Sequence, residues 1–169
     1  MNIRIVCVGK LKEKYWQGAE AEYLKRLSSY AKMEIVELKE SPSDDVHEEG
    51  AYMLKALGAQ VADISAKNSS NIKAAVRKQT DYIITLEIKG KSLDSEQLAA
   101  KINDLAIEGT SNITFIIGGS NGLSPEVSAM ADFKLSFSAM TFPHQMMRVI
   151  LLEQIYRSFK IIRGEKYHK

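Results

Sequence analysis

Apolar and polar residues alternate along the chain in two kinds of block, short apolar runs and longer segments with helical spacing. The short runs predict five buried strands, at 3–8, 33–38, 81–88, 112–117 and 133–138. The longer segments predict helices at 15–30, about 45–57, 95–107, just after 124 and 143–163. Strands that alternate with helices are typical of an α/β fold with a mostly parallel sheet flanked by helices. We therefore expect a single domain over residues 1–169.

Capping residues refine several boundaries. Asp44 or Asp45 is suited to cap the helix that runs to about residue 57. Gly109 follows the helix at 95–107, and Ser124-Pro125 begins a short helix, because proline suits the first helical position. The signal from 58 to 70 is poor, and a turn at 68–71 is expected to cap a short helix over 72–79.

The last helix carries more apolar surface than one packing face requires. Its main stripe is continued by a second set of apolar side chains, namely Met146, Val149, Ile150, Leu152 and Tyr156. A helix on the outside of a sheet needs one such stripe. The excess favours a homodimer across a two-fold axis, and the alternative is a helix sandwiched within its own domain.

Composition and charge narrow the class of protein. The single cysteine, Cys7, lies in an apolar run and excludes a disulfide framework. No signal peptide or membrane-length segment is evident, so we expect a cytoplasmic protein. Residues 34–49 hold seven acidic residues and one lysine, whereas residues 143–169 hold six basic and two acidic ones. A chain with a basic end is suited to a polyanion, although solvated helix faces explain the same charges.

Ligand chemistry is expected where the predicted strands end, since ligands of open α/β sheets bind beyond the carboxyl ends of the strands. Glycines let a ligand approach the backbone there, and a bulky side chain at Gly118 is expected to fill that space. A P-loop needs a glycine five positions before Gly90, where Thr85 stands, and no G-x-G-x-x-G pattern occurs. A nucleoside-like cofactor without phosphate, such as S-adenosylmethionine (SAM), remains open.

Other site chemistries find less support. His47, His144 and His168 are far apart, and Cys7 has no cysteine partner, so no metal site is predicted. From its place just after Pro143, His144 is interpreted as a structural histidine at a helix start. His168 lies next to the end of the chain, where side chains are usually frayed and without function.

Several motifs in a fixed order resemble the RlmH family of SPOUT-class methyltransferases. They are Val8-Gly9-Lys10-Leu11-Lys12, the run Phe115–Gly122, the run Leu135–Gln145, Glu153–Arg157 and the terminal Arg163–Lys169. The resemblance covers about the first 38 residues and all of 81–169, while 39–80 does not match. It implies a deep trefoil knot in the C-terminal half, a homodimer, and methylation of N3 of a pseudouridine in a hairpin loop of 23S ribosomal RNA on the assembled ribosome.

The resemblance also implies site residues. The cofactor positions carried over by motif are Leu86, Gly118 and the loop Phe137, Ser138, Ala139, Met140, Thr141 and Phe142. The tail pair Tyr167-His168 matches the family's functional tail. N3 of pseudouridine must lose a proton, and a histidine suits that task. We therefore assign His168 as the base and Tyr167 as its orienting or stacking partner. Phosphate contacts are expected from Arg148, Arg157, Lys166 and Lys169.

Two alternatives to this function remain. One is a SPOUT methyltransferase with a different RNA target, and the other is a ribosome-binding protein without catalysis.

Overall fold

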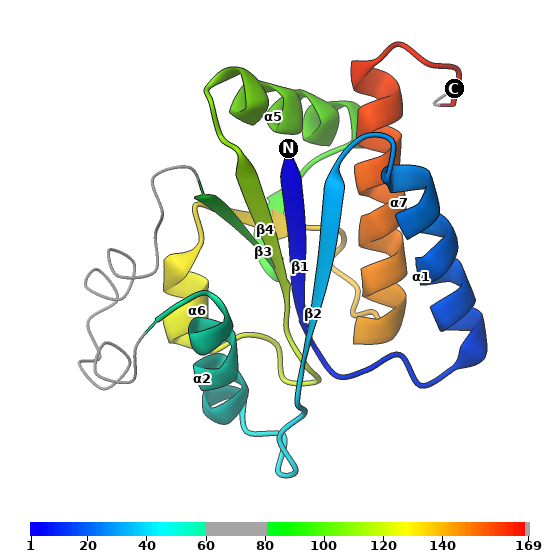
Figure 1. The fold of residues 1–169 in the computed structure, drawn as a ribbon. Coiled ribbons are helices and arrows are strands. Elements are labelled where there is room, and N and C mark those ends of the chain that lie inside the picture. The colour runs from blue at the N-terminus through cyan, green and yellow to red at the C-terminus, as the bar shows by residue number, and fades with distance from the viewer. Residues whose placement is uncertain (60–80, 168–169) are drawn as a thin grey trace.

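Five strands form a parallel sheet in the computed structural model, which describes residues 1–59 and 81–167. They are β1 (Asn2–Val8), β2 (Lys32–Leu38), β3 (Asp81–Ser92), β4 (Asn112–Ile117) and β5 (Phe133–Ser136). Their order across the sheet is β2-β1-β4-β3-β5, and every neighbouring pair is parallel (Figure 1). The predicted parallel α/β sheet is confirmed. The turn at 68–71 and the helix at 72–79 lie outside the described residues.

Helices cover both faces of this sheet (Figure 1). The helices α1 (Lys14–Leu27), α5 (Ser95–Ile107) and α7 (His144–Ile162) pack on one face, and α2 (Val46–Ala56) and α6 (Pro125–Met130) pack on the other. Strand residues such as Ile5 and Phe115 belong to the first apolar core, whereas Val6 and Ile116 belong to the second. The sheet is therefore buried on both faces, which explains the continuous apolar runs of its central strands. None of the helices among the described residues has the length and apolarity to cross a membrane.

The predicted caps of α2 and α6 are confirmed, and for α2 the structure chooses between two candidates. The side chain of Asp45 accepts hydrogen bonds from the backbone N–H groups of His47 and Glu48, so Asp45 caps α2. Asp44 instead has a positive φ of 51° and lies in the turn before the cap. Ser124 caps α6 with Pro125 behind it.

Strand β3 is longer than the apolar pattern predicts, and the reason is an irregularity in its pairing with β5. Leu86 and Lys91 both pair with Leu135, so the residues between them bulge out of the ladder. The backbone of β5 approaches closely at Gly90, where a Cβ atom would lie 2.7 Å from the carbonyl oxygen of Lys134. Gly90 therefore allows the strand to continue, whereas the sequence analysis ended the strand at residue 88.

The additional apolar residues of α7 fall into two groups. Leu152 is fully buried and Tyr156 packs against the larger core, so these residues are satisfied within the chain. Met146, Val149 and Ile150 are half-buried and belong to neither core cluster of the described residues. A narrower apolar stripe than expected is thus left without a partner.

A buried arginine joins α7 to the N-terminal part of the chain. Arg148 is 1% exposed, and its guanidinium lies 2.7 Å from the carboxylate of Glu37 and 3.2 Å from that of Glu20. It also donates a hydrogen bond of 2.8 Å to the carbonyl oxygen of Gly9. The side chain therefore links α7 with β2, α1 and the loop after β1.

Replacing Arg148 by alanine should destabilise the fold, because a large, fully buried side chain is removed together with its contacts to Gly9, Glu20 and Glu37. The expected loss is about 2–4 kcal/mol in the free energy of unfolding, measured by urea denaturation. Arg26→Ala is the matched control, since Arg26 forms an exposed pair with Glu22 on α1 and should cost about 0.5 kcal/mol. Similar losses in the two variants would contradict a special role for Arg148.

Candidate cofactor site

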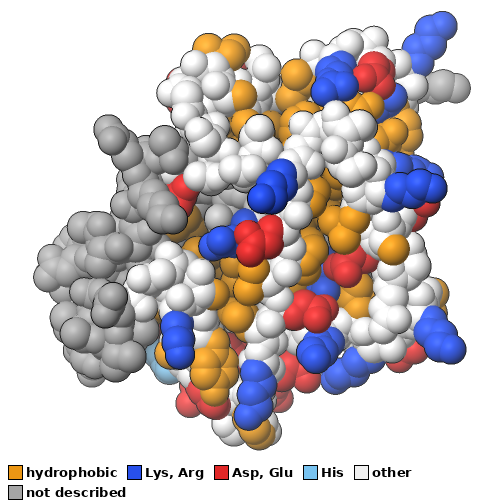
Figure 2. Space-filling view, in the orientation of Figure 1, with side chains coloured by type: hydrophobic (Ala, Val, Ile, Leu, Met, Phe, Trp, Pro, Cys, Tyr) orange, Lys and Arg blue, Asp and Glu red, His pale blue; other side chains and the backbone are white. Residues whose placement is uncertain are grey.

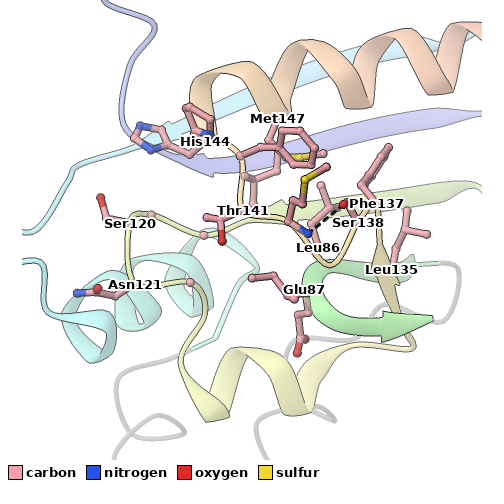
Figure 3. A pocket seen from close by; sticks show the side chains of 18 residues that line it. Leu86, Glu87, Ser120, Asn121, Leu135, Phe137, Ser138, Thr141, His144 and Met147 are labelled. Atoms are coloured by element: carbon pink, nitrogen blue, oxygen red, sulfur yellow. Dashed lines mark hydrogen bonds between the residues drawn. The ribbon is translucent and has the colours of Figure 1, made fainter. Parts of the chain in front are cut away.

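A cavity of about 770 Å³ opens at the carboxyl edge of the sheet, where β3, β4 and β5 end (Figure 3). This volume is in the range of small-molecule and cofactor sites. Three loops and the start of α7 line it, with residues Leu86, Glu87, Ile88, Ile117–Gly122, Leu135, Phe137, Ser138, Met140–Pro143, His144 and Met147. The ends of three predicted strands thus meet at one cavity, at the edge of the sheet where ligand chemistry was expected.

The loop after β4 folds back on itself, and its glycines are required for that. Gly119 and Gly122 form an antiparallel bridge, and Gly122 has a positive φ of 79°. A Cβ atom at Gly118 would run into the backbone of Gly122. A side chain at Gly118 therefore distorts the loop itself, and this is a more direct effect than the filling of ligand space that we expected.

The loop after β5 supplies the opposite wall. The hydroxyl of Ser136 donates to the carbonyl oxygen of Ile88, which ties this loop to the bulge of β3. Ser138 accepts a hydrogen bond of 2.9 Å from the N–H of Met140. Five of the six residues predicted from this loop line the cavity, and Ala139, which is exposed, does not.

His144 also lines the cavity. The sequence analysis interpreted it as a structural histidine at a helix start and did not assign it to the site. In Figure 3 it lies at the same end of the cavity as Ser120. Its Nε2 atom is buried without a hydrogen-bond partner among the described residues, and it lies 3.8 Å from a carboxylate oxygen of Glu40. The position of His144, directly after the last loop and at the start of α7, was the available signal.

Two of the predicted phosphate contacts are engaged elsewhere. Arg148 is buried and paired with Glu20 and Glu37, so its assignment to RNA binding is wrong for the chain as described. Arg157 is half-buried, pairs with Glu153 at 2.7 Å and lies over the ring of Tyr167. On the face shown in Figure 2, Lys and Arg side chains along the α1 edge likewise have acidic neighbours.

The C-terminal tail folds back against α7 and away from the cavity of its own chain. The hydroxyl of Tyr167 donates a 3.0 Å hydrogen bond to Glu153, and its ring packs edge-on against Tyr156. Burial and the bond to Glu153 raise the pKa of Tyr167, so its hydroxyl stays protonated at neutral pH. None of these three residues lines the cavity. Lys166 is exposed, and His168 and Lys169 lie outside the described residues.

Among the described residues, no group of three or more His, Cys, Asp or Glu side chains is arranged to hold a metal ion. Cys7 is buried on β1, and burial raises the pKa of its thiol to about 12, with Arg148 opposing the shift. The thiol is therefore an unreactive core group.

Comparison with known proteins identifies the class to which this fold and cavity belong. The sequence profile described as "Predicted SPOUT methyltransferase" matches residues 1–168. Among solved structures, a tRNA (m1G37) methyltransferase from Aquifex aeolicus matches with a TM-score of 0.50 at 13% identity, over 93% of this chain and 70% of that one. A "probable methylase family protein" from Haemophilus influenzae Rd KW20 matches with a TM-score of 0.54 at 14% identity, over 99% and 70%. The chain belongs to the SPOUT methyltransferase family.

Within that family, the resemblance to RlmH is confirmed. The chain is 53% identical to the ribosomal RNA large subunit methyltransferase H of Clostridium novyi and 51% identical to that of Bifidobacterium adolescentis. Both matches cover 100% of this chain and 100% of the relative. The match therefore includes residues 39–80, which the sequence analysis left outside the resemblance.

Proposed function

We propose that this chain is a SAM-dependent methyltransferase that modifies N3 of a pseudouridine in a hairpin loop of 23S ribosomal RNA. It acts on the assembled ribosome, in the cytoplasm and as a homodimer. The observation that carries the proposal is the cavity at the carboxyl edge of the sheet, in a chain whose full-length relatives are named ribosomal RNA large subunit methyltransferases.

The walls of the cavity fit SAM. Leu86, Phe137, Met140 and Phe142 offer apolar surface for an adenosine, and the loop at Gly118 presents backbone groups. Ser138 and Thr141, both in the loop after β5, add hydroxyl groups to the wall of the cavity. When bound, SAM supplies an activated methyl group, so the protein's task is orientation and electrostatics. The trefoil knot implied by the family would hold these loops together, and it stays a prediction.

Transfer to N3 needs a base that removes the N3 proton, and we assign this role to His168. Tyr167, held protonated by Glu153, is suited to donate a hydrogen bond or to stack on the splayed nucleotide rather than to act as a base. Lys166 and Lys169 remain as phosphate contacts. Arg157 also remains, because 26% of its side chain is exposed beside the pair with Glu153, whereas Arg148 does not.

In a homodimer, the C-terminal tail of one copy can reach the cavity of the other copy, although it lies away from the cavity of its own chain. Met146, Val149, Ile150, Glu153 and Arg157 follow one another at helical spacing along one side of α7. A two-fold axis that crosses α7 near Ile150 would pair the unpartnered apolar stripes of two antiparallel helices. It would also bring Glu153 and Tyr167 of one copy next to the cavity-lining Met147 of the other. The active site would then be shared between the copies.

Gly118→Ala should abolish SAM binding, because the added methyl group collides with the backbone of Gly122. Gly18→Ala on α1 is the matched control, since nothing lies within 4 Å of its added Cβ atom, and it should bind like the native chain. Calorimetric titration with SAM measures both variants. A native chain that fails to bind SAM, alone and in the presence of ribosomes, would refute the proposed cofactor and favour a ribosome-binding protein without catalysis.

Ile150→Glu should convert the dimer into a monomer, because a carboxylate in a closed apolar interface is costly. The molecular mass measured by sedimentation at micromolar concentration should fall from about twice the chain mass to the chain mass of 18.9 kDa. Ile107→Glu on α5 is the control, since Ile107 is 76% exposed, and it should leave the mass unchanged. Ile155 is unsuitable for this test, because it is fully buried in the core of its own chain. Dimers that persist in Ile150→Glu would place the interface elsewhere.

His168→Ala should slow methyl transfer by ~10²–10⁴-fold while SAM binding persists, as expected for loss of a general base. Tyr167→Phe keeps the ring and removes the bond to Glu153, so it separates hydroxyl chemistry from stacking. Single-turnover methylation of ribosomes measures the rates. A mixture of Gly118→Ala chains with chains that lack residues 167–169 should recover activity through mixed dimers. Full activity of the truncated chain alone would show the tail to be dispensable.

The RNA target is tested separately from the cofactor. In a strain that lacks the protein, mapping of methylated nucleotides should show the loss at a 23S pseudouridine. Loss at another nucleotide would favour a SPOUT methyltransferase with a different target.

A further inference from the structure

Glu49 is a buried carboxylate whose surroundings do not account for its charge. Its side chain lies at the start of α2, and the residue is 3% exposed. One oxygen, Oε1, accepts a hydrogen bond of 3.1 Å from the backbone N–H of Ser41. Among the described residues, no Lys, Arg or His side chain forms an ion pair with Glu49 and no group donates a hydrogen bond to Oε2, which is not one of the fully buried unpartnered atoms and so keeps some contact with solvent. Buried carboxylates are normally paired with a cation or accept several hydrogen bonds.

The carboxylate stands against the wall of the cofactor cavity. A Cβ atom built on Gly119 would lie 2.5 Å from Oε2 and 3.1 Å from Oε1 of Glu49. Gly119 also lines the cavity, so its backbone contacts the cavity and the Glu49 carboxylate at once. Because Gly119 has no side chain, no further layer of side-chain atoms is added between them at this position.

The surrounding contacts hold the start of α2 and the glycine loop together. The side-chain amide of Asn121 donates a 2.7 Å hydrogen bond to the carbonyl oxygen of Asp44. Gly50 packs so closely against Ser124 that a Cβ atom would collide with its hydroxyl. The start of α2 partly offsets the buried charge through the helix dipole, and the N–H of Ser41 donates to Oε1.

We infer that Glu49 is a positioning and specificity residue whose negative charge, acting across Gly119, favours a cationic group of the ligand in the cavity. This inference rests on the proposed function, in which the ligand is SAM. SAM carries two cations, the sulfonium and the ammonium of its methionine part, and either supplies the missing charge. Because Glu49 is 3% exposed, such an interaction is screened less than one between surface charges.

The test compares three ligands in Glu49→Gln, which keeps the shape of the side chain and removes its charge. SAM carries both cations, S-adenosylhomocysteine carries only the ammonium, and 5′-methylthioadenosine carries neither. We expect SAM affinity to fall about tenfold or more, as for a screened charge pair at close range, and methylthioadenosine affinity to stay within about twofold. An unchanged affinity for S-adenosylhomocysteine assigns the sulfonium as the partner of Glu49, and an equal fall assigns the ammonium.

Glu48→Gln is the matched control. Glu48 precedes Glu49 on the same helix, but its carboxylate bonds the hydroxyls of Ser41 and Tyr52 rather than facing Gly119. All three affinities should stay at the native level in this variant. If Glu49→Gln does not fold, Gly119→Ala takes its place, because the added methyl group must displace the Glu49 carboxylate. The same loss for cationic ligands is then expected, with methylthioadenosine least affected.

The outcome that overturns the inference is an equal change for all three ligands, or no change for SAM, in a folded variant. Either result would leave Glu49 with a structural role only. Failure of the native chain to bind SAM is a different result, since it contradicts the proposed cofactor itself.

Discussion

The buried guanidinium of Arg148 connects parts of the chain that are far apart in sequence, and the cofactor cavity depends on that connection. Its three partners lie on the loop after β1, on α1 and on β2. Arg148 stands one turn into α7, so these contacts fix the start of the helix against the first third of the chain. Pro143, His144 and Met147, which line the cavity, are held in place by the same contacts.

The acidic segment at 34–49 is largely exposed, but three of its carboxylates have specific neighbours in the structure. Glu37 pairs with Arg148, and Glu40 lies near both Lys12 and His144. Glu49 stands behind Gly119 in the wall of the cavity. Three carboxylates from one short segment thus face the start of α7, the rim of the cavity and the glycine loop in turn. Glu37 and Glu40 have cationic partners in Arg148 and Lys12, whereas Glu49 has none among the described residues.

The helix α7 combines three roles along its length. Its first turns line the cavity, and Leu151, Ile155 and Phe159 fill the core beneath the sheet. Met146, Val149 and Ile150 leave an apolar stripe, which Glu153 and Arg157 continue with polar groups. One helix therefore belongs to the cavity, to the core and to the surface proposed for a second copy. This overlap explains why its sequence is apolar well beyond a single stripe.

The sequence by itself determined the order of strands and helices, most of their boundaries, and that a ligand site would lie at the carboxyl ends of the strands. Apolar runs, caps such as Asp45 and Ser124, and glycines at strand ends act locally, so their effects are readable without knowledge of the fold. Tertiary structure decided what depends on distant partners. It decided that Arg148 is buried rather than RNA-facing, because Glu20 and Glu37 reach it from other elements. It decided that β3 continues past Gly90, because β5 approaches the backbone there. It also brought Glu49 behind Gly119, 70 residues away in sequence, since burial and charge pairing are properties of neighbours in space rather than along the chain.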